Sequence, residues 1–418
     1  MAKRQRMGKT LAALRRRPEV RRAAAVARRQ RLGLWIVGGA LRDRALGRAV
    51  PEIDVAVSGN AERFARALES TGLGRAVFLS RGRPGPRVFR LAGPRPLDVA
   101  EVEGGSIEAD LARRDFTVNA VALDTETGAI LDPFSGLSDL ALRRLRCVHE
   151  RNLAEDPLRP LRAARFLATH GLTPDRETLR ASRKVSPRLS DVAPERIAAE
   201  LSKLLEGERA APALEWAAAA GLLPGAMRRD LSPARALRVS RALRAADEPA
   251  VRRLAPSRRR RLRLALLAAR LGIAPAEARS WLGHLRWTRR EADEVARLLE
   301  LAVSAHAVRG RREASRWMLV AGPLAEDALR LLGWRWPRQR AAARRLERLR
   351  RRPRRSVAVR GGDIIEWLRI SPGPAVGEWL TRVRVAVAMG EVQNRREARA
   401  WLSEQVRSRP APAIIGAH

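Results

Sequence analysis

The pattern of apolar residues changes at about residue 150, and this change limits the folds that the chain can adopt. Before it, short apolar segments alternate with turns rich in glycine and proline, which is typical of a small mixed sheet with short helices. After it, only long segments of Leu, Ala and Arg with helical periodicity follow. The sequence therefore predicts an α/β head followed by an all-helical remainder.

The expected elements can be placed along the chain, and they suggest a division into parts. Strands are expected at 34–39, 50–57, 76–80, 87–92, 96–102 and 118–124, and helices of the head at 40–47 and 61–72. Later helices are expected at 155–170, 194–206, 211–221, 235–246, 257–271, 275–286, 288–304 and 311–321. The expected parts are a basic N-terminal arm or helix (1–31), the head (32–148), a neck (149–210), a body (211–305) and a tail (306–418).

Basic residues far outnumber acidic ones: 84 Lys and Arg stand against 45 Asp and Glu, a formal net charge of +39. A GC-rich genome explains part of the arginine excess, but a field of this size indicates a polyanionic partner, with nucleic acid as the first candidate. The single cysteine, Cys147, excludes a disulfide framework and fits a reducing cytoplasm. No apolar stretch reaches membrane-spanning length, and the basic N-terminus lacks the apolar core of a secretory signal.

Two carboxylates lie two residues apart in the apolar segment VPEIDVAV. Side chains alternate between the faces of a strand, so Glu52 and Asp54 would point to the same side. An exposed strand face would explain this spacing, and so would a site for a divalent cation such as Mg²⁺, which carboxylates and substrate phosphates hold together. Asp98, in a neighbouring predicted strand, would add a third carboxylate if its strand pairs beside the first.

Two further segments carry groups that suit phosphate. In VGGALRD, Gly38 and Gly39 lie between a predicted strand and a predicted helix, where the backbone can approach an anion. In DLARRDF, Arg113 and Arg114 precede Asp115, and the planar fork of arginine binds phosphate with two hydrogen bonds. Taken alone, a plain turn explains the glycines and a solvated turn explains the arginines.

The segment EDPLRPLRAARF predicts a ridge of charged side chains on a helix. Asp156, Arg159, Arg162 and Arg165 are spaced by three and would lie on one face, with Pro157 in the first turn of the helix. An arginine ridge beside an acid can hold a triphosphate and offer both donors and an acceptor to a base. A surface ladder of salt bridges is the alternative interpretation.

In this order and spacing, these motifs closely resemble those of class II tRNA nucleotidyltransferases, the CCA-adding group of the polymerase-beta-like superfamily, which is related to bacterial poly(A) polymerases. The matching elements are LWIVGGALRD, PEIDVAV, DLARRDFTVNAVALD, DPFSGLSDLALRRLR and EDPLRPLRAARF. Residues 193–207 are similar to the neck motif that follows in this family, and 361–402 to its tail helices. The resemblance implies an α/β nucleotidyltransferase head with a small mixed sheet, followed by an all-α neck, body and tail.

The resemblance also implies an activity: the 3′-hydroxyl of tRNA attacks the α-phosphate of CTP or ATP without a nucleic-acid template, and pyrophosphate leaves. Glu52 and Asp54 match metal-binding positions, and Asp98 is expected to join them as a third carboxylate. Mg²⁺ is the expected ion, and Arg114 is expected to be a further catalytic residue. The expected nucleotide contacts are Gly38, Gly39, Arg42, Arg114, Asn119, Asp156, Arg159, Arg162 and Arg165. Of these, Asp156 and Arg159 match the pair that hydrogen-bonds the incoming base. The expected partners are the tRNA 3′ end, CTP and ATP, in the cytoplasm and without a membrane; the sequence indicates no protein partner.

The sequence departs from the family pattern at several places, and each departure leaves an alternative open. Glu52 stands where the family normally has Asp; since the other motifs are intact we expect an active enzyme, with a catalytically impaired RNA-binding relative as the alternative. The segment between Asp98 and Asp110 is short, as in members that add only CC. Poly(A) polymerase is a near alternative, although SRGRPGPRVFRL matches its usual strand poorly. The basic runs at 258–263 and 338–355 predict either solvated helix faces or phosphate-binding surfaces.

Overall fold

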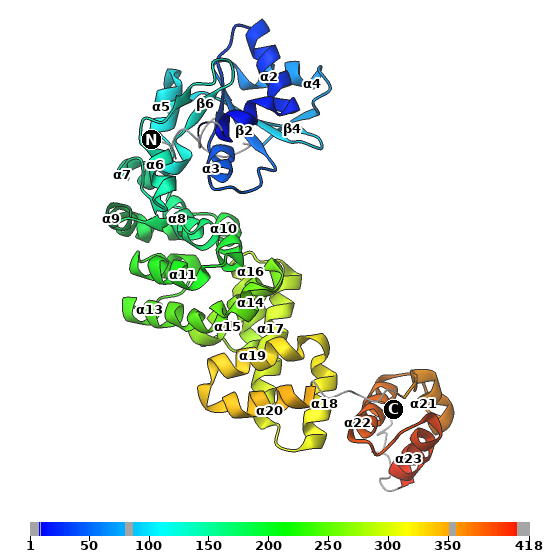
Figure 1. Ribbon diagram of the computed structural model, residues 1–418. Helices are drawn as coiled ribbons and strands as arrows, with labels where there is room; N and C mark the ends of the chain where they lie inside the picture. The colour runs from blue at the N-terminus through cyan, green and yellow to red at the C-terminus, as the bar shows by residue number, and fades with distance from the viewer. Residues whose placement is uncertain (1–7, 9, 80–86, 351–356, 408–418) are drawn as a thin grey trace, which may run out of the picture. The chain divides into compact units, whose positions relative to one another are not determined.

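The computed structural model describes residues 8, 10–79, 87–350 and 357–407 (Figure 1). The chain forms two compact units, residues 1–252 and 253–418, each described here by itself. The first contains a mixed sheet with helices and continues as helices, and the second is helical. The predicted fold class, an α/β head followed by an all-α remainder, is confirmed.

The head is built on a seven-stranded sheet in the order β3-β4-β5-β2-β1-β6-β7. The strands are β1 (Leu34–Val37), β2 (Ile53–Val57), β3 (Arg75–Phe78), β4 (Val88–Ala92), β5 (Leu97–Glu101), β6 (Ala122–Asp124) and β7 (Ile130–Leu131). Neighbouring strands are antiparallel except β2 and β5, which run parallel. This parallel pair lies at the centre of the sheet and aligns two of the predicted acids.

Helices cover the sheet. The head contains α2 (Pro18–Arg29), α3 (Gly39–Ala45), α4 (Ala61–Glu69), α5 (Ile107–Ala112) and α6 (Gly136–Ala141), with 3₁₀ turns η1 (Ala13–Arg16), η2 (Glu103–Gly105) and η3 (Thr117–Asn119). Val20 of α2 and Phe64 of α4 share one core with Ile53 and Val55 of β2. The segment predicted as a basic arm or helix therefore contains a helix whose apolar side belongs to the core of the head.

Some predicted strands begin later than expected. Within 50–57 the strand starts at Ile53, so Glu52 lies just before it, and within 118–124 only Ala122–Asp124 is a strand. A second, two-stranded sheet of β8 (Arg144–Leu145) and β9 (Thr173–Pro174) was not expected. Strands of two residues carry no alternation of apolar side chains, so sequence pattern cannot reveal them.

The predicted helix at 155–170 is wrong in its first turn. The structure has two helices in this region, α7 (Glu150–Glu155) and α8 (Arg159–His170). The backbone of Asp156, between them, is extended, with φ −133° and ψ 101°. A residue that precedes proline is pushed out of the helical region, and Asp156 precedes Pro157. Asp156 therefore lies before the helix, and only the three arginines share the predicted ridge.

The remainder of the first unit is helical. Its elements are α9 (Arg176–Val185), η4 (Ser186–Asp191), α10 (Pro194–Glu206), α11 (Ala210–Ala219), α12 (Leu223–Met227), α13 (Pro233–Ala242), η5 (Leu243–Asp247) and α14 (Pro249–Arg252). Several bounds lie within two residues of the predicted ones, for instance 194–206, because a proline in the first turn and the apolar periodicity agree there.

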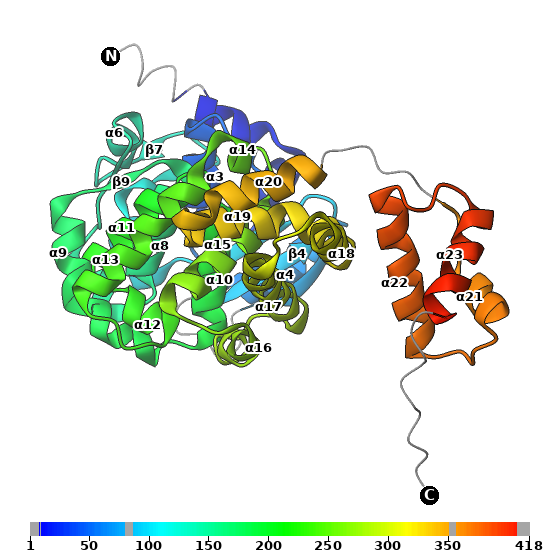
Figure 2. The ribbon, with the colours of Figure 1, turned by 90° about the horizontal axis from the view of Figure 1, so that it is seen from below.

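The second unit begins with α15 (Pro256–Leu271), α16 (Pro275–His284), α17 (Arg289–Ser304), η6 (Ala305–Ala307), α18 (Arg311–Ala321), η7 (Gly322–Leu324), α19 (Ala325–Arg335), η8 (Pro337–Gln339) and α20 (Arg340–Arg350). Three further helices, α21 (Gly361–Leu368), α22 (Pro374–Met389) and α23 (Arg395–Arg407), gather around a small apolar core (Figure 2). Within the described residues, none of the helices has both the length and the apolar character needed to cross a membrane.

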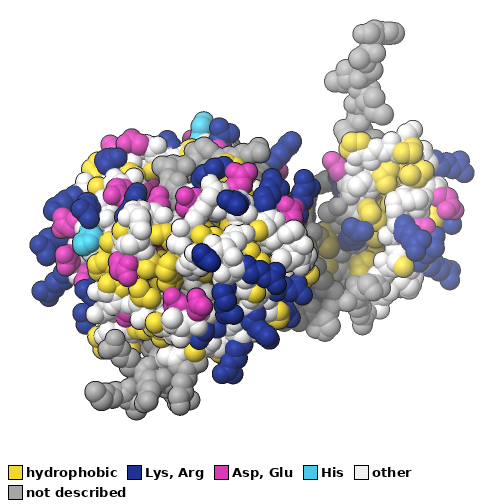
Figure 3. Space-filling model, turned by 90° about the horizontal axis from the view of Figure 1, so that it is seen from above, with side chains coloured by type: hydrophobic (Ala, Val, Ile, Leu, Met, Phe, Trp, Pro, Cys, Tyr) yellow, Lys and Arg dark blue, Asp and Glu magenta, His cyan; other side chains and the backbone are white. Residues whose placement is uncertain are grey.

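On the face that Figure 3 shows, arginine and lysine side chains are scattered among fewer acidic ones. The basic run at 258–263 is an exception, because its arginines are engaged inside the second unit. Arg258 and Arg261 both bind Asp327, a carboxylate with no exposed surface, and Arg260 forms an ion pair with Glu291. Of the two interpretations, a phosphate-binding surface at 258–263 is not supported, since most of its charge is already neutralised.

Candidate active site

Three adjacent strands bring charged side chains into one row. In the register of the sheet, Asp54 of β2 stands beside Asp98 of β5, and Asp98 stands beside Arg90 of β4. Residues directly opposite each other across paired strands share a face, so the three side chains lie on the same side of the sheet. The face is opposite to the one where Ile53 and Val55 enter the core.

Glu52 joins this row from the residues just before β2. Its Oε2 accepts a hydrogen bond from Nη2 of Arg90 at 2.9 Å. Arg90 also donates from Nε and Nη2 to the two oxygens of Asp98, each at 2.7 Å. Glu52 and Asp98 are therefore bridged by the guanidinium of Arg90, and Asp54 lies beside Asp98.

Arg90 was not among the residues expected at the site. Its segment reads as an ordinary strand, and the importance of the arginine depends on the register between β4 and β5. The one signal in the sequence was a charged residue flanked by Phe89 and Leu91, which are buried on the other face.

Asp54 differs from the two acids that Arg90 holds. Burial is the main cause that raises the pKa of Asp54 to about 6. The negative charges of Asp98 and Glu52 also raise it, whereas Arg114 and Arg42 act in the opposite direction. No side chain or backbone group of the described residues donates a hydrogen bond to its carboxylate. A half-buried carboxylate without a hydrogen-bond donor, next to two more acids, provides the hard oxygen ligands that Mg²⁺ prefers.

The donor set therefore fits a divalent cation, but it is not arranged around a single point. Within residues 8, 10–79, 87–350 and 357–407, no group of three or more His, Cys, Asp or Glu side chains is gathered closely enough to hold a metal ion. The guanidinium of Arg90 lies between Glu52 and Asp98 instead.

The glycine turn keeps the space beside these acids open. Gly38 has φ 68°, and a Cβ there would lie 2.9 Å from Nη1 of Arg114. A Cβ on Gly39 would lie 3.7 Å from Oδ2 of Asp54. The predicted turn thus needs glycine at position 38 because of its positive φ and its close approach to an arginine.

A chain of hydrogen bonds connects the head to α8. Arg42 donates from Nη1 to Oδ1 of Asn119 at 2.7 Å, and Asn119 donates from Nδ2 to Oδ1 of Asp115 at 2.8 Å. Nε of Arg162 donates to the other oxygen of Asp115 at 2.8 Å. Arg114 binds Asp110 through two nitrogens, at 3.1 and 2.7 Å, and contacts the carbonyl of Asn119 at 3.4 Å.

Asp115 is the centre of this chain. Burial alone would raise its pKa, but Arg162, Asn119 and Arg159 outweigh burial and hold the pKa at about 2. The carboxylate is therefore ionised at every pH at which the protein is handled. The sequence showed Asp115 only as part of a charged loop, because its partner Arg162 lies 47 residues further along the chain.

The residues predicted to select the base lie where α7 ends and α8 begins. Oδ2 of Asp156 accepts a hydrogen bond from Nη2 of Arg196 at 2.6 Å. Nη1 of Arg159 donates to the carbonyls of Asn152 at 2.7 Å and Arg113 at 3.1 Å. Both side chains are thus fixed in place, and Arg196, from α10, is a neighbour that sequence reasoning missed.

Arg165 is held differently from the other arginines of α8. It forms an ion pair with Glu200 at 2.5 Å, is 12% exposed, and stacks on the ring of Phe166 with 4.2 Å between the guanidinium carbon and the ring centre. Arg42 approaches the same ring at 4.8 Å. The predicted nucleotide contacts of Arg162 and Arg165 stay predictions, since each already binds a carboxylate.

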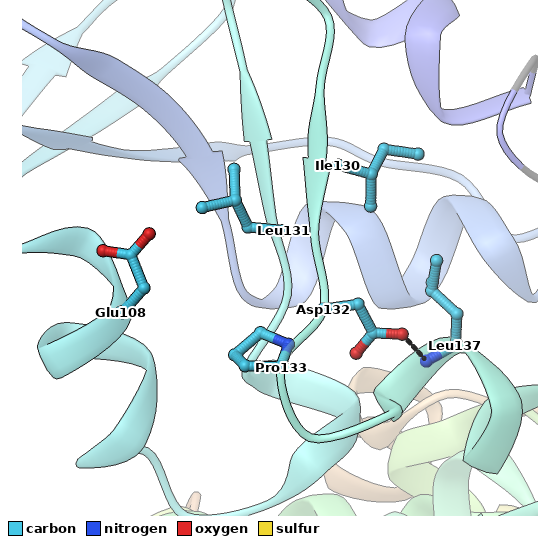
Figure 4. A pocket seen from close by; sticks show the side chains of 6 residues that line it. All are labelled: Glu108, Ile130, Leu131, Asp132, Pro133 and Leu137. Carbon is cyan, nitrogen blue, oxygen red and sulfur yellow. Dashed lines mark hydrogen bonds between the residues drawn. The ribbon is translucent and has the colours of Figure 1, made fainter.

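A separate cavity of about 460 Å³ lies in the head, lined by Glu108, Ile130, Leu131, Asp132, Pro133 and Leu137 (Figure 4). The carboxylate of Asp132 accepts hydrogen bonds from the backbone nitrogens of Gly136 at 2.6 Å and Leu137 at 3.1 Å. Asp132 therefore fixes the start of α6, and none of the predicted site residues lines this cavity.

Comparison with known families agrees with the geometry. Residues 34–146 match the family model of the poly A polymerase head domain. Residues 171–227 match the RNA and SrmB-binding site of polymerase A, and 258–401 match tRNA nucleotidyltransferase domain 2. The first match spans the sheet with its row of acids, and the other two cover much of the helical remainder.

Curated relatives match over nearly the whole chain. The CCA-adding enzyme of Geobacillus stearothermophilus is 33% identical over 90% of this chain and 94% of its own. The CC-adding tRNA nucleotidyltransferase of Geobacter sulfurreducens is 32% identical over 93% and 96%. A crystal structure of the Bacillus stearothermophilus CCA-adding enzyme in complex with CTP superposes with a TM-score of 0.67 at 29% identity, covering 94% of this chain and 98% of that one. The chain belongs to the family of CCA-adding and CC-adding tRNA nucleotidyltransferases.

Proposed function

We propose that the protein adds C, or C and A, from CTP and ATP to the 3′ end of tRNA without a nucleic-acid template. The observation that carries the proposal is the row of Glu52, Asp54 and Asp98 beside a glycine turn and two arginines, Arg42 and Arg114. Such a site meets the needs of nucleotidyl transfer, which depends on positioning and charge neutralisation. A cytoplasmic location belongs to this proposal and rests on the tRNA substrate and the single cysteine.

In the proposed reaction, the 3′-oxygen of tRNA forms a bond to the α-phosphorus, and the bond from that phosphorus to the β-phosphate oxygen breaks. Pyrophosphate leaves with the electrons of that bond. The proton of the 3′-hydroxyl passes to water, since the carboxylates of the row are assigned to the metal. Glu52, Asp54 and Asp98 are the residues that would hold Mg²⁺, which when bound supplies positive charge to the reacting phosphates.

The remaining residues bind and orient the nucleotide. We assign the triphosphate to Gly38, Gly39, Arg42 and Arg114, with Asn119 fixing Arg42 through its side-chain oxygen. Two further sets complete the assignment: Asp156 and Arg159 for the base, and Arg162 and Arg165 for additional nucleotide contacts. When nucleotide binds, Arg162 and Arg165 would either contact it while still paired with Asp115 and Glu200, or leave these carboxylates for the nucleotide.

We further propose that addition stops after CC. The segment between Asp98 and Asp110 consists of the end of β5, the short turn η2 and the start of α5, which the side chain of Ser106 caps. The segment therefore contains no long loop of the kind that the resemblance associates with the switch from C to A. CCA addition and poly(A) synthesis are the alternatives.

An incorporation assay tests these proposals. A tRNA transcript ending before CCA is incubated with labelled CTP, ATP or both, with Mg²⁺, and products are resolved at nucleotide resolution. Addition of two C residues and no A supports CC addition; a further A shows a CCA-adding enzyme. Long A tails on unrelated RNA would instead favour poly(A) synthesis.

The same assay addresses the catalytically impaired alternative. If the protein binds tRNA but incorporates nothing with either Mg²⁺ or Mn²⁺, the proposed transfer is wrong and the chain acts as an RNA-binding protein.

A further inference from the structure

Arg90 is hydrogen-bonded to two of the three predicted metal-binding acids. Its two hydrogen bonds to Asp98 form the fork geometry that binds a carboxylate most firmly, and its third goes to Glu52. The strand β4 fixes its backbone between β3 and β5, so the guanidinium is presented by a paired strand and not by a loop. Two of the three acids are therefore occupied, and Asp54 is left without a donor.

Building on the proposed function, we propose that Arg90 is a built-in counter-ion that competes with divalent cations for Asp98 and Glu52. While Arg90 binds them, Asp54 is the one carboxylate of the three that is open. Mg²⁺ usually combines one or two carboxylates with phosphate oxygens of the substrate. The metal therefore enters together with the nucleotide, whose phosphates supply the missing ligands, and free Mg²⁺ binds the empty enzyme weakly.

The length of Glu52 suits this arrangement. Glu52 lies before β2, is 49% exposed, and reaches Nη2 of Arg90 at 2.9 Å. An aspartate there would be shorter by one methylene, about 1.5 Å, and would lose or stretch this contact. The glutamate that departs from the family pattern is thus explained as a second anchor for Arg90.

The test is the affinity of the nucleotide-free enzyme for Mn²⁺, measured by calorimetry on wild type and on Arg90→Met. Methionine keeps much of the length of the arginine stem and removes the charge. An opposite charge within ~4–6 Å shifts the pKa of a carboxylate by about 1–3 units, so the Mn²⁺ affinity should rise at least about tenfold without it. Arg90→Lys keeps a charge but cannot bind both oxygens of Asp98 as a fork, so it should fall between the two.

Arg87→Met is the matched control. Arg87 lies three residues earlier and pairs with Glu62 at 2.6 Å, so its loss should leave the Mn²⁺ affinity unchanged. Glu52→Asp should raise the affinity by less than Arg90→Met, since Asp98 keeps its bonds to Arg90.

Equal Mn²⁺ affinity in wild type and a folded Arg90→Met would overturn the proposal. Circular dichroism and thermal unfolding establish whether the variant is folded; if it is not, an unchanged affinity in Arg90→Lys has the same meaning. Incorporation of CTP by the wild type separates this result from a failure of the proposed function. An enzyme that incorporates CTP but shows no change refutes only the role of Arg90, whereas a wild type without incorporation refutes the transfer reaction.

Discussion

Arginines meet carboxylates in two contrasting ways in this protein. In the head, Glu52, Asp54 and Asp98 lie in a row, and Arg90 donates hydrogen bonds to Glu52 and Asp98 but not to Asp54. In the second unit, Asp327 is fully buried and receives hydrogen bonds from both Arg258 and Arg261 at 2.7–3.1 Å.

The difference separates a reactive site from a structural one. A buried carboxylate that is fully hydrogen-bonded fixes the packing of the helices around it, here α15 and α19. A cluster in which acids outnumber their donors is electrostatically strained, which is typical of sites that bind a ligand or ion. The comparison therefore predicts opposite effects on stability when an acid is removed from each cluster.

The largest expected effect is at Asp327. Replacing it in Asp327→Ala leaves two half-buried arginines without their buried carboxylate and should lower the stability of the second unit by about 3–5 kcal/mol. Urea unfolding followed by tryptophan fluorescence measures this, since eight of the ten tryptophans, all but Trp35 and Trp216, lie in that unit. In the control Asp293→Ala, which removes an exposed partner of Arg279, the loss should be at most ~1 kcal/mol. Equal losses in both variants would refute the structural role of Asp327.

Asp54→Ala should reduce nucleotide incorporation by a factor on the order of 10³, equivalent to several kcal/mol of transition-state stabilisation. The reason is loss of the open carboxylate of the row, while tRNA binding should persist. Single-turnover incorporation of CTP and a filter-binding measurement with tRNA give the two quantities. The exposed acid Glu62, changed in Glu62→Ala, is a control in the same head and should retain activity. Near-normal incorporation by Asp54→Ala would mean that the site has been assigned incorrectly.

Asp54→Asn should stabilise the metal-free protein, unlike any change at Asp327. The folded-state pKa of Asp54 is raised from 3.8 to about 6, so the ionised carboxylate costs stability above that pH. The gain should be about 1–3 kcal/mol at pH 8, shrink as the pH falls through 6, and vanish below about pH 4, where Asp54 is protonated in both states. Unfolding in EDTA across this range tests it; a stability difference that does not depend on pH would contradict the electrostatic explanation.

The smallest expected effect on stability concerns the second basic run. Its described part includes Arg344 and Arg348 of α20, which are exposed and one helical turn apart, with no ion pair to any residue that the structure describes. Replacing both with alanine should change stability by no more than about 0.5 kcal/mol. If they contact phosphates, the slope of log affinity for tRNA against log salt should fall by up to about 2. The control is Arg290→Ala: the side chain of Arg290 is 88% exposed but paired with Glu294, so its loss should leave the slope unchanged. Equal slopes in the wild type, the double variant and Arg290→Ala would exclude α20 from the RNA surface.

Much of the head and of its site could be predicted from the sequence. The spacing of Glu52 and Asp54 and the position of Asp98 identified the row of acids, because strand periodicity fixes the direction of side chains. Arg90 could not be found this way, since its meaning depends on the register of two paired strands. The ridge in EDPLR was partly wrong because proline moves the residue before it out of the helix.

The sequence by itself determined the change from α/β to all-α, the family, and the acids that converge, since each follows from local periodicity or from motif order. Only the tertiary structure decided how each charge is used. The runs at 258–263 and 338–355 are both rich in arginine, yet the buried Asp327 of α19 binds two arginines of the first, whereas Arg344 and Arg348 of the second are exposed. Charge pairing depends on distances between residues far apart in the chain, and those distances exist only in the folded molecule.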